Sequence, residues 1–348
     1  MKNSKIRTIS RRKFMGTSAT MVAGVSLVGP SLFGATSKLE IYKKPNSLIN
    51  GVQIGAITYS FRSMPNQSAE ATLKYVVDSG ISAIELMGDP AETFAGRVKN
   101  PVDWRAYYTV REARKKGTIS GDQEKELDAM EAKRTAYKKE VASWRARVSM
   151  DKFEQLGKMY LDAGVSIYAF KPSAFGKDNT DAEIDWGLRA AKAMGASHVT
   201  LEHPGDDAWT QKLGDMGEKH GIYVAYHGHL QQTPTLWDTA LKQSKYNAVN
   251  LDLGHFVAAG NAAPLEFIIA KHDRIKSMHV KDRQNKVHGQ KNLPWGQGDT
   301  PIAQALQLIR DNNYKFPASI ELEYEIPEGS NAIQEVTKCL DYCKTALT

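Results

Sequence analysis

The feature that most constrains this chain is an alternation of eight short β-like runs with amphipathic helical stretches. Glycine often marks the join from helix to strand, as at Gly80 and Gly221. The expected strands are Val52–Ser60, Ser82–Met87, Ser166–Lys171, His198–His203, Ile222–His229, Val249–Leu253, Lys276–Val280 and Ala318–Tyr324. The expected helices include Ala69–Ser79, Asp181–Met194, Thr210–His220, Thr235–Ser244, Ala263–His272 and Pro301–Asn312. This pattern predicts an α/β protein with a single (β/α)8 barrel over residues 48–348, because an open doubly wound sheet would more naturally use five or six strands.

One interval in this alternation is too long for a simple loop, since about 78 residues separate the second and third expected strands. Within it, Val110–Arg147 is densely charged and favours helix, and Gly117 and Gly121 bracket a turn. We therefore expect a helical insertion over residues 97–150. It is either a solvated decoration, or a lid or a contact between copies in a homo-oligomer, because its aromatic side chains need burial. These aromatics are Trp104, Tyr107, Tyr108, Tyr137 and Trp144.

The N-terminal segment, residues 1–35, has the features of a targeting signal. Ser10–Met15 resembles a twin-arginine export signal, and a weakly apolar stretch rich in Ala, Gly, Ser and Val follows it. The stretch is shorter than the ~20 apolar residues that span a bilayer. We expect a periplasmic protein with no stable membrane insertion after cleavage near Gly34 and Ala35. The alternative is an uncleaved amphipathic anchor.

Charge and cysteine content exclude several classes of protein. The chain has 46 basic and 39 acidic residues, but six of the basic residues lie in residues 1–35, which leaves 40 basic against 39 acidic. A nearly neutral mature chain gives no electrostatic footprint for nucleic acid. Cys339 and Cys343 are the two cysteines of the sequence. Two cysteines build neither a disulfide framework nor a cysteine-rich zinc site.

Metal-capable and charged side chains gather where the expected strands end. In a barrel of this kind, catalytic residues stand at these C-terminal ends. A charge inside a barrel is costly unless it is paired or bound to a metal. The residues are Glu85, Lys171, Glu202, His227, His229, Asp252, His255, His279, Lys281, Asp282, Arg283, Glu321 and Glu323. Their mixture of carboxylate and imidazole, with open positions, suits one divalent ion, either Mn²⁺, Zn²⁺, Fe²⁺, Co²⁺ or Mg²⁺.

Residues 52–345 resemble the sugar phosphate isomerase/epimerase superfamily, the xylose-isomerase-like TIM barrels. The resemblance rests on Asp252–His255 with Ala259 and Gly260, which is similar to the dehydratase-type branch, and on Arg274 and Ile275 leading into His279–Asp282. It implies one divalent ion held by four residues from the last four strands. Asp252, His279 and Glu323 match three of these positions. The fourth is a Glu in the family, and here either His227 replaces it or Glu202 reaches over from the preceding strand.

The resemblance also implies roles for the other residues. Glu202 and Glu323 are the candidates for base and acid, and Glu321 is expected outside the ligand set. His229 and His255 would orient hydroxyls or protonate a leaving oxygen, whereas Lys171 and Arg283 would polarise substrate oxygens. Residues expected to shape the substrate pocket are Glu85, Tyr59, Phe61 and Trp295.

These observations predict a metal-dependent isomerase or epimerase that acts on a small carbohydrate, a sugar or keto-sugar, through an enediolate. A keto-glycoside lyase or hydratase would use the same metal and base for elimination. A periplasmic sugar-binding barrel without catalysis is the alternative from another class. An endonuclease IV-like nuclease is opposed by the export signal and by the nearly neutral mature chain.

Overall fold

The structure is a computed structural model that describes residues 44–348. The predicted export signal, residues 1–35, lies outside the described residues and stays a prediction. Among residues 44–348, no helix is both long enough and apolar enough to cross a membrane.

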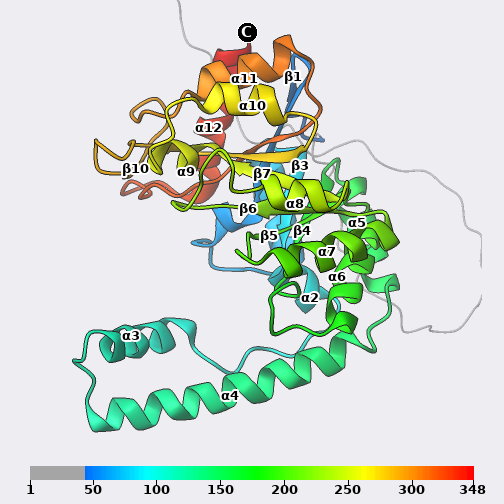
Figure 1. Cartoon of the computed structure of the whole chain (residues 1–348), viewed down its shortest axis with the longest axis vertical. Coiled ribbons are helices and arrows are strands. Elements are labelled where there is room, and N and C mark those ends of the chain that lie inside the picture. Colours follow the sequence, from blue (N-terminus) through cyan, green and yellow to red (C-terminus); the bar gives the residue numbers. More distant parts are fainter. Residues whose placement is uncertain (1–43) are drawn as a thin grey trace, which may run out of the picture. The chain divides into compact units, whose positions relative to one another are not determined.

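Eight parallel strands form a closed barrel, as the sequence predicts (Figure 1). The strands are β2 (Val52–Ile57), β3 (Ala83–Met87), β4 (Ser166–Lys171), β5 (His198–Glu202), β6 (Tyr223–His227), β7 (Asn247–Asp252), β8 (Ile275–Val280) and β11 (Ala318–Ile320). Each strand pairs with the next along the chain, and β2 pairs with both β3 and β11, which closes the ring. This closure excludes the open doubly wound sheet. Three two-residue strands lie outside the ring: β1 (Leu48–Ile49), β9 (Asp282–Arg283) and β10 (Asn292–Leu293).

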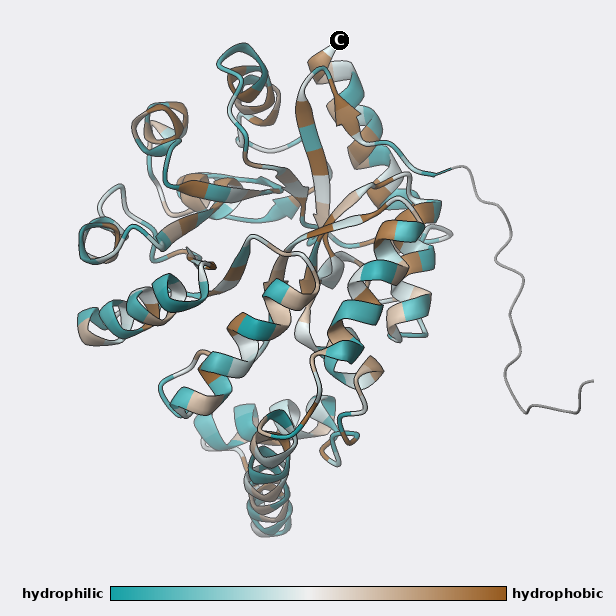
Figure 2. Ribbon diagram, turned by 90° about the vertical axis from the view of Figure 1, so that its right-hand side faces the viewer, coloured by the Kyte–Doolittle hydropathy of each residue, from teal (hydrophilic) through white to brown (hydrophobic). Residues whose placement is uncertain are grey.

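Helices surround the strands, and their apolar faces pack against the outside of the barrel (Figure 2). The helices of the ring are α1 (Ala69–Asp78), α2 (Gly88–Phe94), α5 (Asp151–Asp162), α6 (Asp181–Ala193), α7 (Asp207–His220), α8 (Asp238–Gln243), α9 (Leu253–Ala258), α10 (Pro264–Lys271), α11 (Ile302–Asp311) and α12 (Ala332–Leu347). The side chains of Thr180 and Glu183 form a capping box at the start of α6, which satisfies backbone N–H groups left free there. Such caps fix where the ring helices begin relative to the strand ends.

The interior of the barrel is unusually polar. His198 donates to or accepts from Ser277 at 3.0 Å, and Tyr168 shares a hydrogen bond with Ser319, all four side chains lying among the strands. Gly55 makes room for this layer, because a Cβ there would lie 2.9 Å from the Tyr168 ring. Barrels of this type usually fill the interior with branched apolar residues. Hydrogen-bonded side chains therefore fill part of the interior and connect the strands below their C-terminal ends.

The predicted insertion is a helical hairpin that projects from the barrel (Figure 1). It consists of α3 (Trp104–Lys115) and α4 (Gly121–Arg145), and both lie between β3 and β4 in the chain. A small core of its own holds the two helices together, formed by Val102, Tyr107, Val110, Leu127 and Met130. The hairpin is thus an ordered arm and not a loop.

A buried arginine fastens this arm to the barrel. The Arg145 guanidinium donates to Glu92 of α2 at 3.0 Å and to Glu183 of α6 at 3.0 Å. It also stacks over the Trp186 ring, 4.7 Å from its centroid. Although burial raises the pKa of Glu92, the charge of Arg145 opposes that shift. The arm is therefore joined to the ring of helices by a charge network with little access to water.

We expect Arg145→Ala to lower the free energy of unfolding by about 3–5 kcal/mol, because it removes the buried cation that Glu92 and Glu183 share. Glu92 would keep only the longer contact with Arg97, at 3.6 Å. The matched control is Arg147→Ala, since Arg147 is exposed and its loss should change stability by less than about 0.5 kcal/mol. Chemical denaturation followed by circular dichroism measures both. Equal stability of the two variants would contradict the anchoring role.

Candidate active site

Four buried side chains from the last four strands of the barrel converge at its C-terminal end. One ligand atom from each of His227, Asp252, His279 and Glu321 lies within 4.8 Å of the others. Asp252 and His279 are direct neighbours in the register between β7 and β8. The mixed imidazole and carboxylate set is the kind that binds Zn²⁺, Mn²⁺, Fe²⁺ or Co²⁺.

His279 lies between two carboxylates. Its Nε2 is 2.7 Å from Glu85 Oε2 and its Nδ1 is 2.9 Å from Glu321 Oε2. Although burial lowers the pKa of His279, these two carboxylates raise it to about 10. Thr200 and Asn250 donate hydrogen bonds to Glu85, at 2.6 and 3.1 Å, and hold it in place. A metal would therefore have to displace a proton from this imidazole.

His227 and Asp252 fit a metal more directly. Burial, followed by the charges of Lys171 and His279, holds the pKa of His227 well below its usual range. Its imidazole is therefore neutral and keeps a lone pair. Burial raises the pKa of Asp252 to about 6, against the charge of Lys281. The buried Asp252 Oδ2 lies 2.8 Å from the Lys281 ammonium, so this oxygen already faces a cation, and a metal ion there would compete with the lysine for it.

Lys281 is a site residue that was not singled out for a role from the sequence. Its ammonium lies 2.8 Å from carboxylate oxygens of Asp252, Glu321 and Glu323. Burial lowers its pKa, but the three carboxylates outweigh this and raise it. The signal in the sequence is its spacing, because Lys281 follows His279 by two residues and faces the same side. The lysine supplies a fixed positive charge where carboxylates crowd together.

Glu202 stands at the exposed edge of the cluster. Its Oε1 accepts a hydrogen bond from Lys171 at 3.0 Å, and its Oε2 is 3.1 Å from His229 Nδ1. Burial raises the pKa of Glu202, but the hydrogen bond from His229 and the nearby positive charges bring it below its usual range. Glu202, His227 and His229 form a second group with metal-ligating geometry, which shares His227 with the first.

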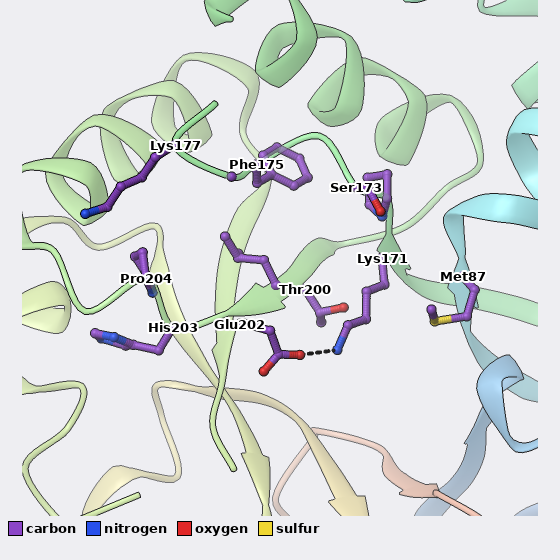
Figure 3. Close-up of a pocket in the computed structure, with 12 residues that line it drawn as sticks. Met87, Lys171, Ser173, Phe175, Lys177, Thr200, Glu202, His203 and Pro204 are labelled. Carbon is purple, nitrogen blue, oxygen red and sulfur yellow. Dashed lines mark hydrogen bonds and ion pairs between the residues drawn. The ribbon is translucent and has the colours of Figure 1, made fainter. Parts of the chain in front are cut away.

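A cavity of about 410 Å³ opens beside Glu202, at the ends of β4 and β5 (Figure 3). Lys171 and Glu202 extend toward each other beside it, and Met87, Phe175 and Thr200 are among the other residues that line it. Because the Glu202 side chain is 49% exposed, a small polar molecule in this cavity can reach it. The cavity therefore gives solvent access to Glu202 and Lys171, which lie at the edge of the four-residue group.

His255 and Arg283 also border the cluster, and the His255 ring packs against the His229 ring, with 4.6 Å between their centroids. Arg283 donates from Nη1 to His255 Nδ1 at 2.6 Å, so the ring proton sits on Nε2. Burial, together with the charges of Lys281 and Arg283, lowers the pKa of His255 to about 2. His255 is thus a neutral hydrogen-bond donor. Its Nε2 lies 3.8 Å from Glu323 Oε2.

Several expected site residues lie elsewhere than the sequence led us to expect. Glu323 is outside the four-residue group that contains Glu321, and its side chain contacts Lys281 and is 21% exposed. Phe61 is buried in the apolar core, 6.1 Å from the Tyr75 ring, because the chain turns into a short 3-10 helix at Thr58–Phe61. Trp295 packs against Tyr342 of α12.

Tyr59 is exposed on the same 3-10 helix, with the Arg62 guanidinium over its ring. Arg62 also lines a second cavity of about 380 Å³, beside Glu323 at the ends of β2 and β11. The other predicted residues, Glu85, Lys171, Glu202, His229, His255 and Arg283, surround the four-residue group. The structure thus brings most of the predicted set together but leaves Phe61 and Trp295 in packed positions.

Comparison with known proteins identifies relatives of this fold. A sequence model of the family described as Xylose isomerase-like TIM barrel matches residues 124–343. No curated protein matches the chain. A sugar phosphate isomerase/epimerase from Parabacteroides distasonis ATCC 8503 has 15% identity and a TM-score of 0.54, over 91% of this chain and 100% of its own.

Two further solved structures share this fold. A probable 3-DHS dehydratase from Bacillus anthracis has 14% identity and a TM-score of 0.54, over 83% of this chain and 97% of its own. The IOLI protein, solved with a bound zinc atom, has 13% identity and a TM-score of 0.55, over 85% of this chain and 99% of its own. At these identities the likeness is one of fold.

The two glutamates of the last strand give a direct test of the metal site. We expect Glu321→Gln to weaken divalent-metal binding by about 100-fold or more, and Glu323→Gln by less than about tenfold, because Glu321 lies in the four-residue group. Calorimetric titration of chelator-treated protein with Zn²⁺ and Mn²⁺ measures both affinities. The reverse order would instead favour Glu323 as the ligand.

Proposed function

Because this chain belongs to the xylose isomerase-like TIM barrel family, we propose that it is a divalent-metal-dependent isomerase or epimerase that acts on a sugar or keto-sugar through an enediolate. The observation that carries this proposal is the buried group of His227, Asp252, His279 and Glu321 beside an accessible carboxylate, Glu202. These four residues would hold the ion. When bound, a divalent ion acidifies the C–H next to a carbonyl and stabilises the negative charge that develops on oxygen.

Glu202 is the proposed base. It is ionised, it faces the cavity, and Lys171 and His229 fix its two oxygens. A substrate oxygen that accepts the hydrogen bond of Lys171 would free one of these oxygens and raise the basicity of Glu202. Lys171 would then donate its hydrogen bond to the substrate oxygen and polarise it, and would no longer donate to Glu202. This exchange of partners would make proton removal depend on correct substrate binding.

Glu323 is the proposed acid on the other side of the substrate. Glu202 ends β5 and Glu323 follows β11, and these strands lie opposite each other in the eight-stranded ring. His227, Asp252 and His279 lie on the strands between them, and Glu321 follows β11, two residues before Glu323. A proton removed from one face and returned from the other would give epimerisation, whereas return to the neighbouring carbon would give isomerisation. His255 would hold a substrate oxygen with its Nε2–H.

We expect keto-sugars incubated with the metal-loaded protein in deuterated water to gain deuterium at the carbon next to the carbonyl. Glu202→Gln should slow this exchange by about 100- to 10,000-fold, because it removes the base. The control is Glu70→Gln, an exposed glutamate of α1. Nuclear magnetic resonance follows the label.

The same experiment distinguishes the alternatives. Release of an aglycone from a keto-glycoside would identify a lyase that uses the site for elimination. Binding of a sugar with no exchange and no release, by a protein that contains metal, would favour a sugar-binding barrel and contradict the enzyme proposal. Exchange that persists in Glu202→Gln would show that another group is the base.

We also propose that residues 1–35 direct export to the periplasm by the twin-arginine route, on the strength of Arg11 and Arg12 followed by Phe14. We expect Arg11→Lys with Arg12→Lys to keep the full chain in the cytoplasm of a bacterium that has this translocase. Cell fractionation measures the distribution. Unchanged export of the double variant would contradict the proposed route.

A further inference from the structure

The outward face of α4 is an unusual helix surface. Residues at positions 122, 125, 129, 132, 136, 139 and 143 follow one another by three or four and share one face. All seven are exposed: Asp122, Lys125, Ala129, Ala132, Ala136, Lys139 and Ser143. The face opposite packs on α3 through Leu127 and Met130. Three alanines in the middle leave room for another helix to approach closely.

Charges flank these alanines with opposite signs toward the two ends of the helix. Asp122 and Glu126 precede Ala129, together with Lys125, which lies 3.7 Å from Asp122 of the same helix. Lys133 and Lys139 follow Ala132. Within residues 44–348, Glu126, Lys133 and Lys139 form no ion pair, although all three are exposed on a helix rich in charge. If a second copy of the helix runs antiparallel, Glu126 of one copy can face Lys133 of the other, and Asp122 can face Lys139.

We propose that α4 of one chain pairs antiparallel with α4 of a second copy, about a twofold axis that passes between Ala129 and Ala132. Ala129 then packs opposite Ala132 of the second copy, and Asp122 lies opposite its Lys139. We call the line of seven exposed residues the seam. Glu126 lies opposite Lys133 beside the seam, where ion pairs between two helices determine which helices pair and in which orientation. The twofold axis repeats each of these contacts.

Charge disfavours two other arrangements of the same helices. A parallel pair would place Lys125 beside Lys125 and Lys139 beside Lys139, and like charges across an interface are costly. An antiparallel pair shifted by one heptad toward the barrel would place Glu126 opposite Glu140 and Lys133 opposite Lys133. In the alanine-centred register, Asp122 meets Lys139 and Glu126 meets Lys133. Lys125 meets Ala136, so no like charges face each other.

The position of α4 is compatible with this contact. The arm projects from the barrel, and the seam lies on the part of α4 beyond its anchor at Arg145 (Figure 1). Because the buried network of Arg145 fixes the arm, little conformational entropy is lost when a second arm docks. The contact joins two barrels through their arms and is independent of the proposed chemistry.

A charge swap tests the pairing. Sedimentation velocity of the full chain over a concentration series should show a monomer–dimer equilibrium. Glu126→Lys alone and Lys133→Glu alone should each weaken dimerisation by about tenfold or more, since each creates two like-charge contacts. The double variant Glu126→Lys with Lys133→Glu should restore the affinity to within about threefold, because the opposite charges meet again. Circular dichroism confirms that each variant is folded.

Cross-linking tests the register. The native cysteines Cys339 and Cys343 are buried, so an introduced surface cysteine reports its own contacts. A mixture of Ala129→Cys and Ala132→Cys chains should form a covalent dimer under mild oxidation. The matched mixture of Ala129→Cys with Thr109→Cys, on exposed α3, should not. A wild type that stays monomeric, a dimer that ignores both charge reversals, or equal cross-linking of the two mixtures would overturn the proposal.

Discussion

The structure depends on charge balance inside a space that water scarcely reaches. Glu85, Asp252 and Glu321 are buried carboxylates at the barrel's C-terminal end, and the positive charges of His279 and Lys281 lie among them at 2.7 to 2.9 Å. Neither sign would be tolerated alone at this depth, because an unpaired buried charge costs several kcal/mol. The ion pairs therefore form only when the strands keep their register. Because these pairs join different strands, they also stabilise that register.

The apolar core lies mainly outside the ring of strands, between the strands and the helices. That core carries the hydrophobic stabilisation and leaves the interior free for Tyr168, His198, Ser277 and Ser319. Burial lowers the pKa of His198 to about 4, so this imidazole is neutral and acts as a hydrogen-bonding group. This neutral, hydrogen-bonded layer lies beneath the charged side chains of the site and supports them without adding a further charge.

The alternation of strands and helices predicts the barrel well, because side-chain periodicity follows directly from backbone geometry. Depth along a strand is harder to predict. Glu321 and Glu323 share a face, and the structure shows that Glu321 is the deeper, because its side chain is buried beside His279 whereas Glu323 is partly exposed. Phe61 was expected to shape the pocket, and the first strand was expected to reach Ser60. The strand ends at Ile57, and the turn that follows sends the ring into the core. The partners of Arg145 lie 38 and 53 residues away, beyond any local pattern.

Asp252 links the chemistry of the site to the backbone beside it. Its Oδ1 accepts a hydrogen bond from the N–H of His255 at 2.8 Å and so caps α9, while its Oδ2 faces the candidate ligands. One carboxylate thus serves a helix and a binding site at once. Any change in charge at Oδ2 alters the electron density at Oδ1, and with it the strength of the cap. Occupancy of the site at Oδ2 and the stability of the start of α9, which carries His255, are therefore coupled.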